Sequence, residues 1–218
     1  IQSLEGKYYP RSCRDYNFSF CTDWESKKPT AIFRGSTTGC GVTINDNMRL
    51  RAAYISHNTP VDENGVPYLD AGISKWNLRP RKLENSEFLQ TIDISKLPFG
   101  LASFVSPIEQ SSFKYILNID GHVTAYRLSL ELSMCSVVLK VDSPWKVWYS
   151  ELLIPYKHYV PIKSDLSDLI DHIKWCRDHD SECKQIAINA RNFYDEYLLK
   201  GGVMDFLQKT LVDLKSKM

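Results

Sequence analysis

The chain has 218 residues, of which 43% are hydrophobic and 24% are charged. These proportions are typical of a globular protein with a sizeable core, and they exclude a disordered tail or a disulfide-held miniprotein. The 27 Lys and Arg residues nearly balance the 26 Asp and Glu residues, so the formal net charge is +1 and broad nucleic-acid binding is disfavoured. No apolar run reaches the length of about 18 residues that a membrane-spanning helix needs.

The start of the chain and its cysteines leave the cellular compartment open. Residues 1–10 contain no apolar block, so they are not a signal peptide, and the Ile at position 1 predicts a processed or trimmed chain. Asn17-Phe18-Ser19 is a glycosylation sequon, a triplet that also arises often by chance. Six cysteines allow fifteen pairings. They are Cys13, Cys21, Cys40, Cys135, Cys176 and Cys183.

The first third of the chain predicts loops and short elements. Residues 31–33 are a short apolar strand that runs into the turn-forming residues 34–39. Residues 57–86 hold several prolines, an Asn-Gly pair and many charges. This composition predicts a connector, one that crosses between two lobes of the protein.

From residue 113 onward, predicted strands and helices alternate. Residues 113–119 are mostly apolar, as in a buried strand, and residues 136–141 are rich in β-branched side chains and predict a second buried strand. Residues 124–134 alternate like a strand, but their length and the Gly turn before them favour a helix. A short helix over 144–153 and a short strand over 159–162 follow. This alternation predicts a parallel sheet in an α/β domain.

Three helices are predicted to close the chain. Ser164 or Asp165 can cap the first, whose apolar positions recur at helical spacing through Ile173. The second continues the pattern over residues 186–197 and is predicted to stop at Lys200-Gly201-Gly202. The third follows to the end of the chain.

Residues 118–127 carry the most informative pattern, a Gly turn between a predicted strand and a predicted helix. Backbone N–H groups at a helix start suit a phosphate, and Arg127, about one turn inside the predicted helix, can add a charged hydrogen bond. Thr124 can donate a hydroxyl. The alternative is a plain turn with a surface Arg, because a single Gly is a weak signal.

Phe33-Arg34-Gly35-Ser36 forms a second candidate for anion binding. An Arg at a strand end can direct its guanidinium at an anion, and the following Gly lets the backbone approach closely. From the pattern alone, a turn Arg in water is favoured over this interpretation.

Two further groups of residues invite functional interpretations. His172, Cys176, His179 and Cys183 are spaced by four, three and four residues, which invites a zinc site, but a Cys176–Cys183 disulfide or unpaired packing residues are favoured. Asp142-Ser143 ends a predicted strand, where α/β sheets place ligand contacts. Five aromatic residues fit either a sugar site or, by preference, the core. They are Trp145, Trp148, Tyr149, Tyr156 and Tyr159.

Taken together, these motifs resemble the family 90 glycosyltransferases, the group of the protein O-glucosyltransferases and fungal capsule-associated proteins. The similar segments occur in the family's order over roughly residues 24–200. They are Trp24 to Ser36, Asp70-Ala71 with Lys75, Phe113 to Arg127, Ser136 to Trp145, and Tyr159 to Leu166.

The resemblance implies a GT-B enzyme, with two Rossmann-like lobes and a nucleotide-sugar in the cleft between them. It implies an inverting transfer from UDP-glucose or UDP-xylose to a glycan or protein hydroxyl, with no obligatory metal or other cofactor. We therefore expect an incomplete or small N-terminal lobe, with a partial acceptor-side segment and connector over residues 1–90. A Rossmann-like nucleotide-sugar-binding domain is expected over 91–200 and a C-terminal helix over 201–218. A eukaryotic member would work in the lumen of the endoplasmic reticulum or Golgi, and a microbial or viral one in the cytoplasm.

The resemblance also assigns residues to roles. Arg34 is expected to act in catalysis by stabilising charge on the departing UDP, while Arg127 grips the diphosphate. The remaining donor-binding residues are expected to be Gly35, Ser36, Gly121, His122, Val123, Thr124, Ala125, Tyr126 and Asp142. No metal ligand is expected.

Two departures from the family pattern bear on mechanism. Asp120 stands where the family has Arg, and His122 replaces a small apolar residue. The family's general base lies well upstream of Phe33, and neither Asp15 nor Asp23 matches it. Besides a transferase, the sequence therefore leaves open a nucleotide-sugar or glycan-binding module without catalysis, and a purely structural α/β interaction domain.

Overall fold

The computed structural model describes residues 21–59, 61–84 and 86–217. Cys13, Asp15 and the sequon Asn17-Phe18-Ser19 lie outside the described residues. Within them, no helix is both long and apolar enough to cross a membrane.

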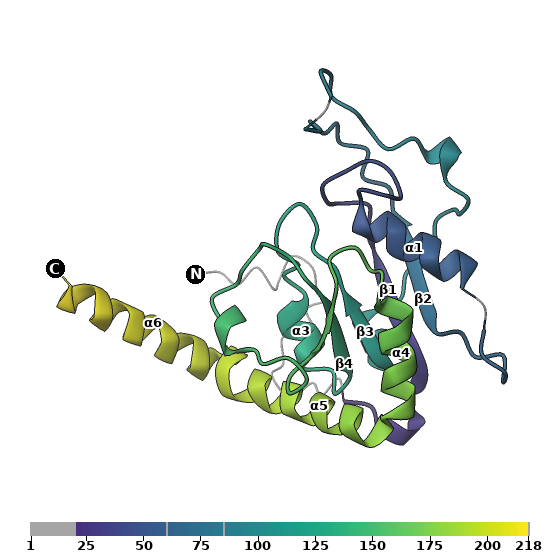
Figure 1. The fold of residues 1–218 in the computed structure, drawn as a ribbon. Coiled ribbons are helices and arrows are strands. Elements are labelled where there is room, and N and C mark those ends of the chain that lie inside the picture. The colour runs from purple at the N-terminus through teal and green to yellow at the C-terminus, as the bar shows by residue number, and fades with distance from the viewer. Residues whose placement is uncertain (1–20, 60, 85, 218) are drawn as a thin grey trace.

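Five parallel strands form one sheet, in the order β2-β1-β3-β4-β5 (Figure 1). The strands are β1 (Lys28–Ser36), β2 (Leu69–Lys75), β3 (Phe113–Asn118), β4 (Val137–Val141) and β5 (Val160–Ile162). Strand β1 pairs with β2 through Phe33 and Ala71, and with β3 through Ile32 and Ile116. The α/β prediction is confirmed, and each strand expected from the apolar runs lies in this sheet.

Alternate side chains of the strands pack on opposite faces of the sheet. On one face, Phe33, Tyr115 and Leu139 are buried with helix α4 (Leu169–Asp178) and the first half of α5 (Asp180–Phe193). On the other face, Ile32 and Ile116 pack on Met134, and Val138 packs on α3 (Leu128–Leu132) and the end of α5. Covering both faces buries most residues of the strands, which explains the nearly continuous apolar sequence of β3 and β4.

The other helical elements are short or peripheral. Helix α1 (Met48–Asn58) links β1 to β2, α2 (Pro107–Gln110) precedes β3, and α6 (Lys200–Ser216) extends away from the sheet (Figure 1). Single turns of 3₁₀-helix occupy Trp24–Ser26, Ile94–Lys96 and Ser150–Leu152, and a π-helical segment, Tyr194–Leu198, joins α5 to α6.

Several predicted helix boundaries are wrong. Helix α3 begins at Leu128, so Arg127 is its N-cap and residues 121–126 are loop and turn. The helix expected over 144–153 is reduced to the 3₁₀ turn at 150–152. Helix α4 begins at Leu169, and Ser164 and Asp165 lie before it, because Leu166 takes a left-handed φ of 59° that a helix cannot contain. Gly201-Gly202 lies inside the first turn of α6.

The expected connector also requires correction. Strand β2 lies within residues 57–86 and forms an edge of the same sheet as β3 to β5. Because β1 and β2 belong to this sheet, the boundary expected at residue 90 does not separate two folded layers. Residues 28–75 contribute β1, α1 and β2 to the same sheet layer as β3 to β5.

The five cysteines that the structure describes divide into one disulfide pair and three free thiols. Cys21 and Cys135 form a disulfide, which ties the segment before β1 to the turn before β4. Cys40, Cys176 and Cys183 are free, and the last two are fully buried. The interpretation of Cys176 and Cys183 as unpaired packing residues is therefore confirmed.

Candidate functional site

The candidate site lies where the sheet reverses its winding direction. From β1 the chain moves to β2 on one side and then to β3 on the other, so the loops after β1 and β3 diverge. Ligands of open α/β sheets bind in the crevice at the carboxyl ends of two such strands. Residues 37–39 follow the end of β1 and residues 119–127 follow the end of β3 at this point, whereas residues 34–36, expected in a turn, belong to β1.

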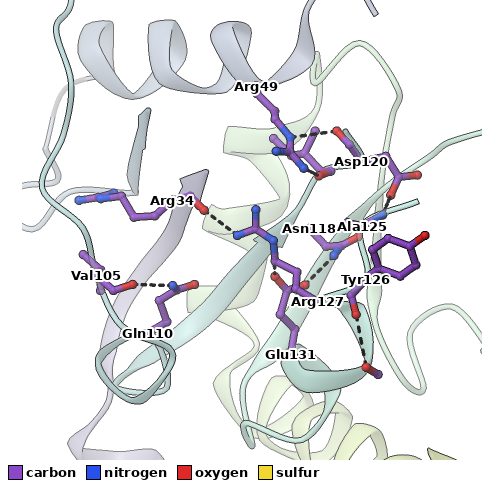
Figure 2. A network of polar contacts seen from close by, with 12 residues as sticks. Arg34, Arg49, Val105, Gln110, Asn118, Asp120, Ala125, Tyr126, Arg127 and Glu131 are labelled. Carbon is purple, nitrogen blue, oxygen red and sulfur yellow. Dashed lines mark hydrogen bonds and ion pairs between the residues drawn. The ribbon is translucent and has the colours of Figure 1, made fainter. Parts of the chain in front are cut away.

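Arg127 lies across the end of β1 (Figure 2). Its Nη1 donates a hydrogen bond of 2.6 Å to the carbonyl oxygen of Arg34, and its guanidinium lies over the Phe33 ring, 5.4 Å from the centroid. A Cβ at Gly35 would lie 2.9 Å from the Nη2 of Arg127 and 3.0 Å from the Phe33 ring. Glycine at position 35 thus makes room for the guanidinium.

Arg49 is a second arginine of the site, and the sequence interpretation missed it. From the first turn of α1, its buried guanidinium donates four hydrogen bonds that join the loops after β1 and β3. The acceptors are the carbonyl oxygens of Ser36, Ile119 and Asp120 and the hydroxyl of Thr38. Burial, and next the charge of Arg127, lowers the pKa of Arg49 below its ordinary value. A basic residue in the first turn of a helix opposes the helix dipole, and this unfavourable placement is the sequence feature that could have identified Arg49.

The loop from Asp120 to Tyr126 is closed on itself. The Asp120 carboxylate accepts a hydrogen bond of 2.6 Å from the Ala125 N–H, and the Gly121 N–H donates to the carbonyl of Val123. The Ala125 N–H, expected to be free for a phosphate, is therefore already used. Tyr126 and Val123 are exposed, and Thr124 is half-buried. Asp120, which stands where the family has Arg, thus stabilises this loop.

His122 is held against the loop after β1. Its Nδ1 faces the Gly39 N–H at 3.4 Å, while its Nε2 is buried with no hydrogen-bond partner among the described residues. Burial, followed by the charges of Arg81 and Arg79, lowers the pKa of His122. The imidazole is therefore neutral near pH 7.

Arg34 does not take the position that its predicted role requires. Its guanidinium donates to the carbonyl oxygens of Ser103, Phe33 and Asp70 and to the Asp70 carboxylate, and only 9% of the side chain is exposed. Figure 2 shows it directed away from Arg127. Arg34 ties β1 to β2 and to the loop at residue 103, so the expected exposure to an anion is absent from this structure.

A buried carboxylate lies beneath Arg127. Glu131 on α3 is 1% exposed, its Oε2 accepts a hydrogen bond of 2.6 Å from Asn118, and its Oε1 lies 3.7 Å from the Nε of Arg127. Burial raises the pKa of Glu131 to about 7, although the nearby guanidinium lowers it. The sequence interpretation did not select Glu131, because a single Glu in an apolar segment carries no local signal.

The remaining candidates are dispersed. Asp142, exposed at the end of β4, accepts a hydrogen bond from the Ser143 N–H and lies on the same edge of the sheet, two strands from β1. The described part of the chain contains no group of three or more His, Cys, Asp or Glu residues that could hold a metal. Asp23 precedes β1, at the opposite edge from Arg127.

Comparison with known proteins places the chain among glycosyltransferases. Residues 19–216 match the model of the family described as "Glycosyl transferase family 90". The chain belongs to glycosyl transferase family 90. The resemblance seen in the sequence motifs is therefore confirmed, because the match covers nearly the whole chain.

Relatives in the family come from viruses and animals. The chain is 51% identical over 220 residues to uncharacterized protein 179R of Invertebrate iridescent virus 6, which covers 95% of the chain and 18% of the relative. It is 40% identical over 109 residues to protein O-glucosyltransferase 2 of Danio rerio, covering 50% of the chain and 22% of the relative. It is 33% identical over 190 residues to human protein O-glucosyltransferase 3, covering 85% of the chain and 32% of the relative. The chain thus spans less than a third of each of these relatives.

Among solved structures, the chain is similar to the crystal structure of TarM, with a TM-score of 0.47 and 14% sequence identity. This similarity covers 84% of the chain and 35% of that structure.

Proposed function

We propose that this chain carries the donor-binding part of a glycosyltransferase of the GT-B type, and that Arg127 binds the diphosphate of a UDP-sugar. The observation that carries the proposal is the difference between three neighbouring arginines. Arg34 and Arg49 each donate four hydrogen bonds to the protein, whereas Arg127 donates one. Arg127 is also the more exposed, at 26%. Its Nε faces the Glu131 carboxylate at 3.7 Å, and the other N–H groups of the guanidinium are available to an anion at the carboxyl edge of the sheet.

In this mechanism a base takes the proton of an acceptor hydroxyl, and the hydroxyl oxygen attacks the anomeric carbon of the donor with inversion while the bond to UDP breaks. Negative charge grows on the leaving diphosphate, and Arg127 stabilises it through charged hydrogen bonds. A guanidinium fixed over Phe33 supplies the positive charge that a divalent ion supplies in metal-dependent transferases. We propose glucose or xylose as the transferred sugar and a protein or glycan hydroxyl as the acceptor.

A second candidate, a module that binds a nucleotide-sugar without transferring it, is favoured by the contacts of Arg34. The arginine expected to assist the leaving group is engaged by Asp70 and three carbonyl oxygens, and we assign no general base among the described residues. Both candidates require UDP binding at Arg127. Only the transferase hydrolyses or transfers the donor sugar.

Isothermal titration with UDP tests the shared requirement. Arg127→Ala is expected to weaken UDP binding by about 2–3 kcal/mol, the usual contribution of a charged hydrogen bond, or roughly 30- to 150-fold in Kd. Arg191→Ala is the matched control, because Arg191 on α5 has a similar exposure of 27% and pairs with Asp195 outside the site. Equal UDP affinity of a folded Arg127→Ala variant and the unchanged protein would overturn the proposal. Release of glucose from UDP-glucose then separates transferase from binding module.

A further inference from the structure

We propose that a hollow on the α4–α5 surface binds a carbohydrate, as a second site separate from the one at Arg127. The hollow has a volume of about 420 Å³, within the usual range of small-molecule sites. Its lining residues are Tyr156, Trp175, Glu182, Gln185, Ile186 and Asn189. The proposal rests on these residues and does not depend on UDP binding.

The hollow lies near the edge of the sheet opposite Arg127. Asp180, at the start of α5, accepts hydrogen bonds from the indole N–H of Trp24 at 3.0 Å and from Lys114 at 2.6 Å. Trp24 precedes β1 and Lys114 is the second residue of β3, so the junction of α4 and α5 lies at the amino ends of the strands. Trp175 and Glu182 lie on either side of this junction.

Two aromatic rings form a corner of the hollow. Tyr156 and Trp175 have centroids 5.7 Å apart and planes inclined at 78°. His179 stacks on Trp175 with centroids 4.7 Å apart, and the hydroxyl of Tyr156 lies 3.2 Å from the Nε2 of His172. These contacts fix the two rings before any ligand binds, so the ring surfaces that line the hollow are already oriented toward the C–H groups of a sugar.

Tyr156 occupies its position at a conformational cost. Its φ of 57° is left-handed, which disfavours a residue with a Cβ, yet 51% of the residue's surface is exposed. Strain of this kind persists where the surrounding structure over-determines it, and it gathers at ligand-binding sites. Burial of the Tyr156 ring does not explain the strain, because half of the residue faces solvent.

The polar wall of the hollow matches neighbouring hydroxyl groups. The amide nitrogen of Gln185 donates to the amide oxygen of Asn189 at 3.0 Å, which leaves the Gln185 carbonyl as an acceptor and the Asn189 NH₂ as a donor. Glu182 lies one helical turn before Gln185 and adds a carboxylate acceptor. Each sugar hydroxyl both donates and accepts, so this set pairs with adjacent hydroxyls. The carboxylate disfavours phosphates.

The test uses the whole chain and methyl β-D-glucopyranoside as the probe, followed through the Trp175 indole N–H signal by NMR. We expect saturable shifts with a Kd of about 1–10 mM, as for a small neutral ligand with few contacts. The double variant Gln185→Ala, Asn189→Ala is expected to raise the Kd at least about fivefold. Gln208→Ala, at an exposed amide on α6, is the matched control and should leave the Kd unchanged.

Two further arms make the outcome decisive. Saturating UDP and the Arg127→Ala variant should leave binding of the glucoside unchanged, so failure of the donor proposal does not affect this test. Glucose 6-phosphate should bind more weakly than the glucoside. Absence of shifts at Trp175, or equal affinity in a folded double variant, would overturn the proposal. Competition by UDP would assign the glucoside to the donor site and would also overturn it.

Discussion

Replacing Glu131 by Gln is predicted to remove a large part of the pH dependence of stability. In the folded protein, burial raises the pKa of Glu131 from 4.5 to about 7. In the unfolded chain the same group ionises near the ordinary value. At pH values between these two pKa values, Glu131 holds a proton in the folded state that it has released in the unfolded state. The free energy of unfolding therefore falls as pH rises. The difference in pKa corresponds to about 3 kcal/mol, lost between about pH 4.5 and pH 7.

The side-chain amide of the Glu131→Gln variant does not titrate, so this fall should be missing from it. Urea unfolding followed by tryptophan fluorescence at several pH values between about 5 and 8.5 gives the two curves. Their difference isolates Glu131, because the other titrating groups contribute to both. Glu151→Gln is the control, since Glu151 is 84% exposed and pairs only with Lys146 at 3.5 Å. Parallel curves for the original protein and the Glu131→Gln variant would show that Glu131 is ionised throughout, and would refute the reasoning.

The remaining predictions concern Gly35 and Arg34 near the end of β1, the Cys21–Cys135 disulfide and the metal dependence of sugar transfer. Gly35→Ala should weaken UDP binding by about tenfold, because its Cβ would lie 2.9 Å from Arg127, and unchanged affinity by titration would contradict the assigned position of Arg127. Arg34→Lys should lower the free energy of unfolding by about 2 kcal/mol through loss of the fork on Asp70, whereas a lower kcat at unchanged stability would restore the catalytic role. Cys21→Ser should cost up to about 4–5 kcal/mol in urea unfolding, since the disulfide closes 114 residues, and an unchanged midpoint would exclude the pairing. Excess chelator should leave sugar transfer intact, and loss of activity that manganese restores would refute the metal-free mechanism.

The sheet was largely predictable from sequence because its buried strands are nearly continuous apolar runs. Residues 113–119 and 136–141 have this pattern, and both form central strands. Strand β2 escaped prediction because an edge strand is under weaker constraint. It contains Asp70 and Gly72, follows Pro67 and has only one neighbour, β1, so its sequence is typical of a loop.

The site was predictable only where it is local in sequence. Arg127 follows the end of β3 by nine residues, and that short interval identified it. Arg49 reaches the same place from a helix 71 residues before Asp120, and only the fold brings the two together. The start of α3 was predicted too early, because the hydrogen bond from the Ala125 N–H to the Asp120 carboxylate stabilises a loop there. Hydrophobic periodicity does not reveal such a hydrogen bond.

The disulfide changes the order in which this topology can assemble. The pairing of β1 with β3 joins Lys28 to Phe113, which are 85 residues apart along the chain. Cys21 lies just before Lys28, and Cys135 lies shortly after Phe113, so in the oxidised chain the path between the paired residues shortens to about 30 residues. Closing the shorter loop costs about 1 kcal/mol less conformational entropy. The pairing of β1 with β3 therefore closes a shorter loop in the oxidised chain. Refolding with the disulfide intact should be several-fold faster than refolding of the reduced chain.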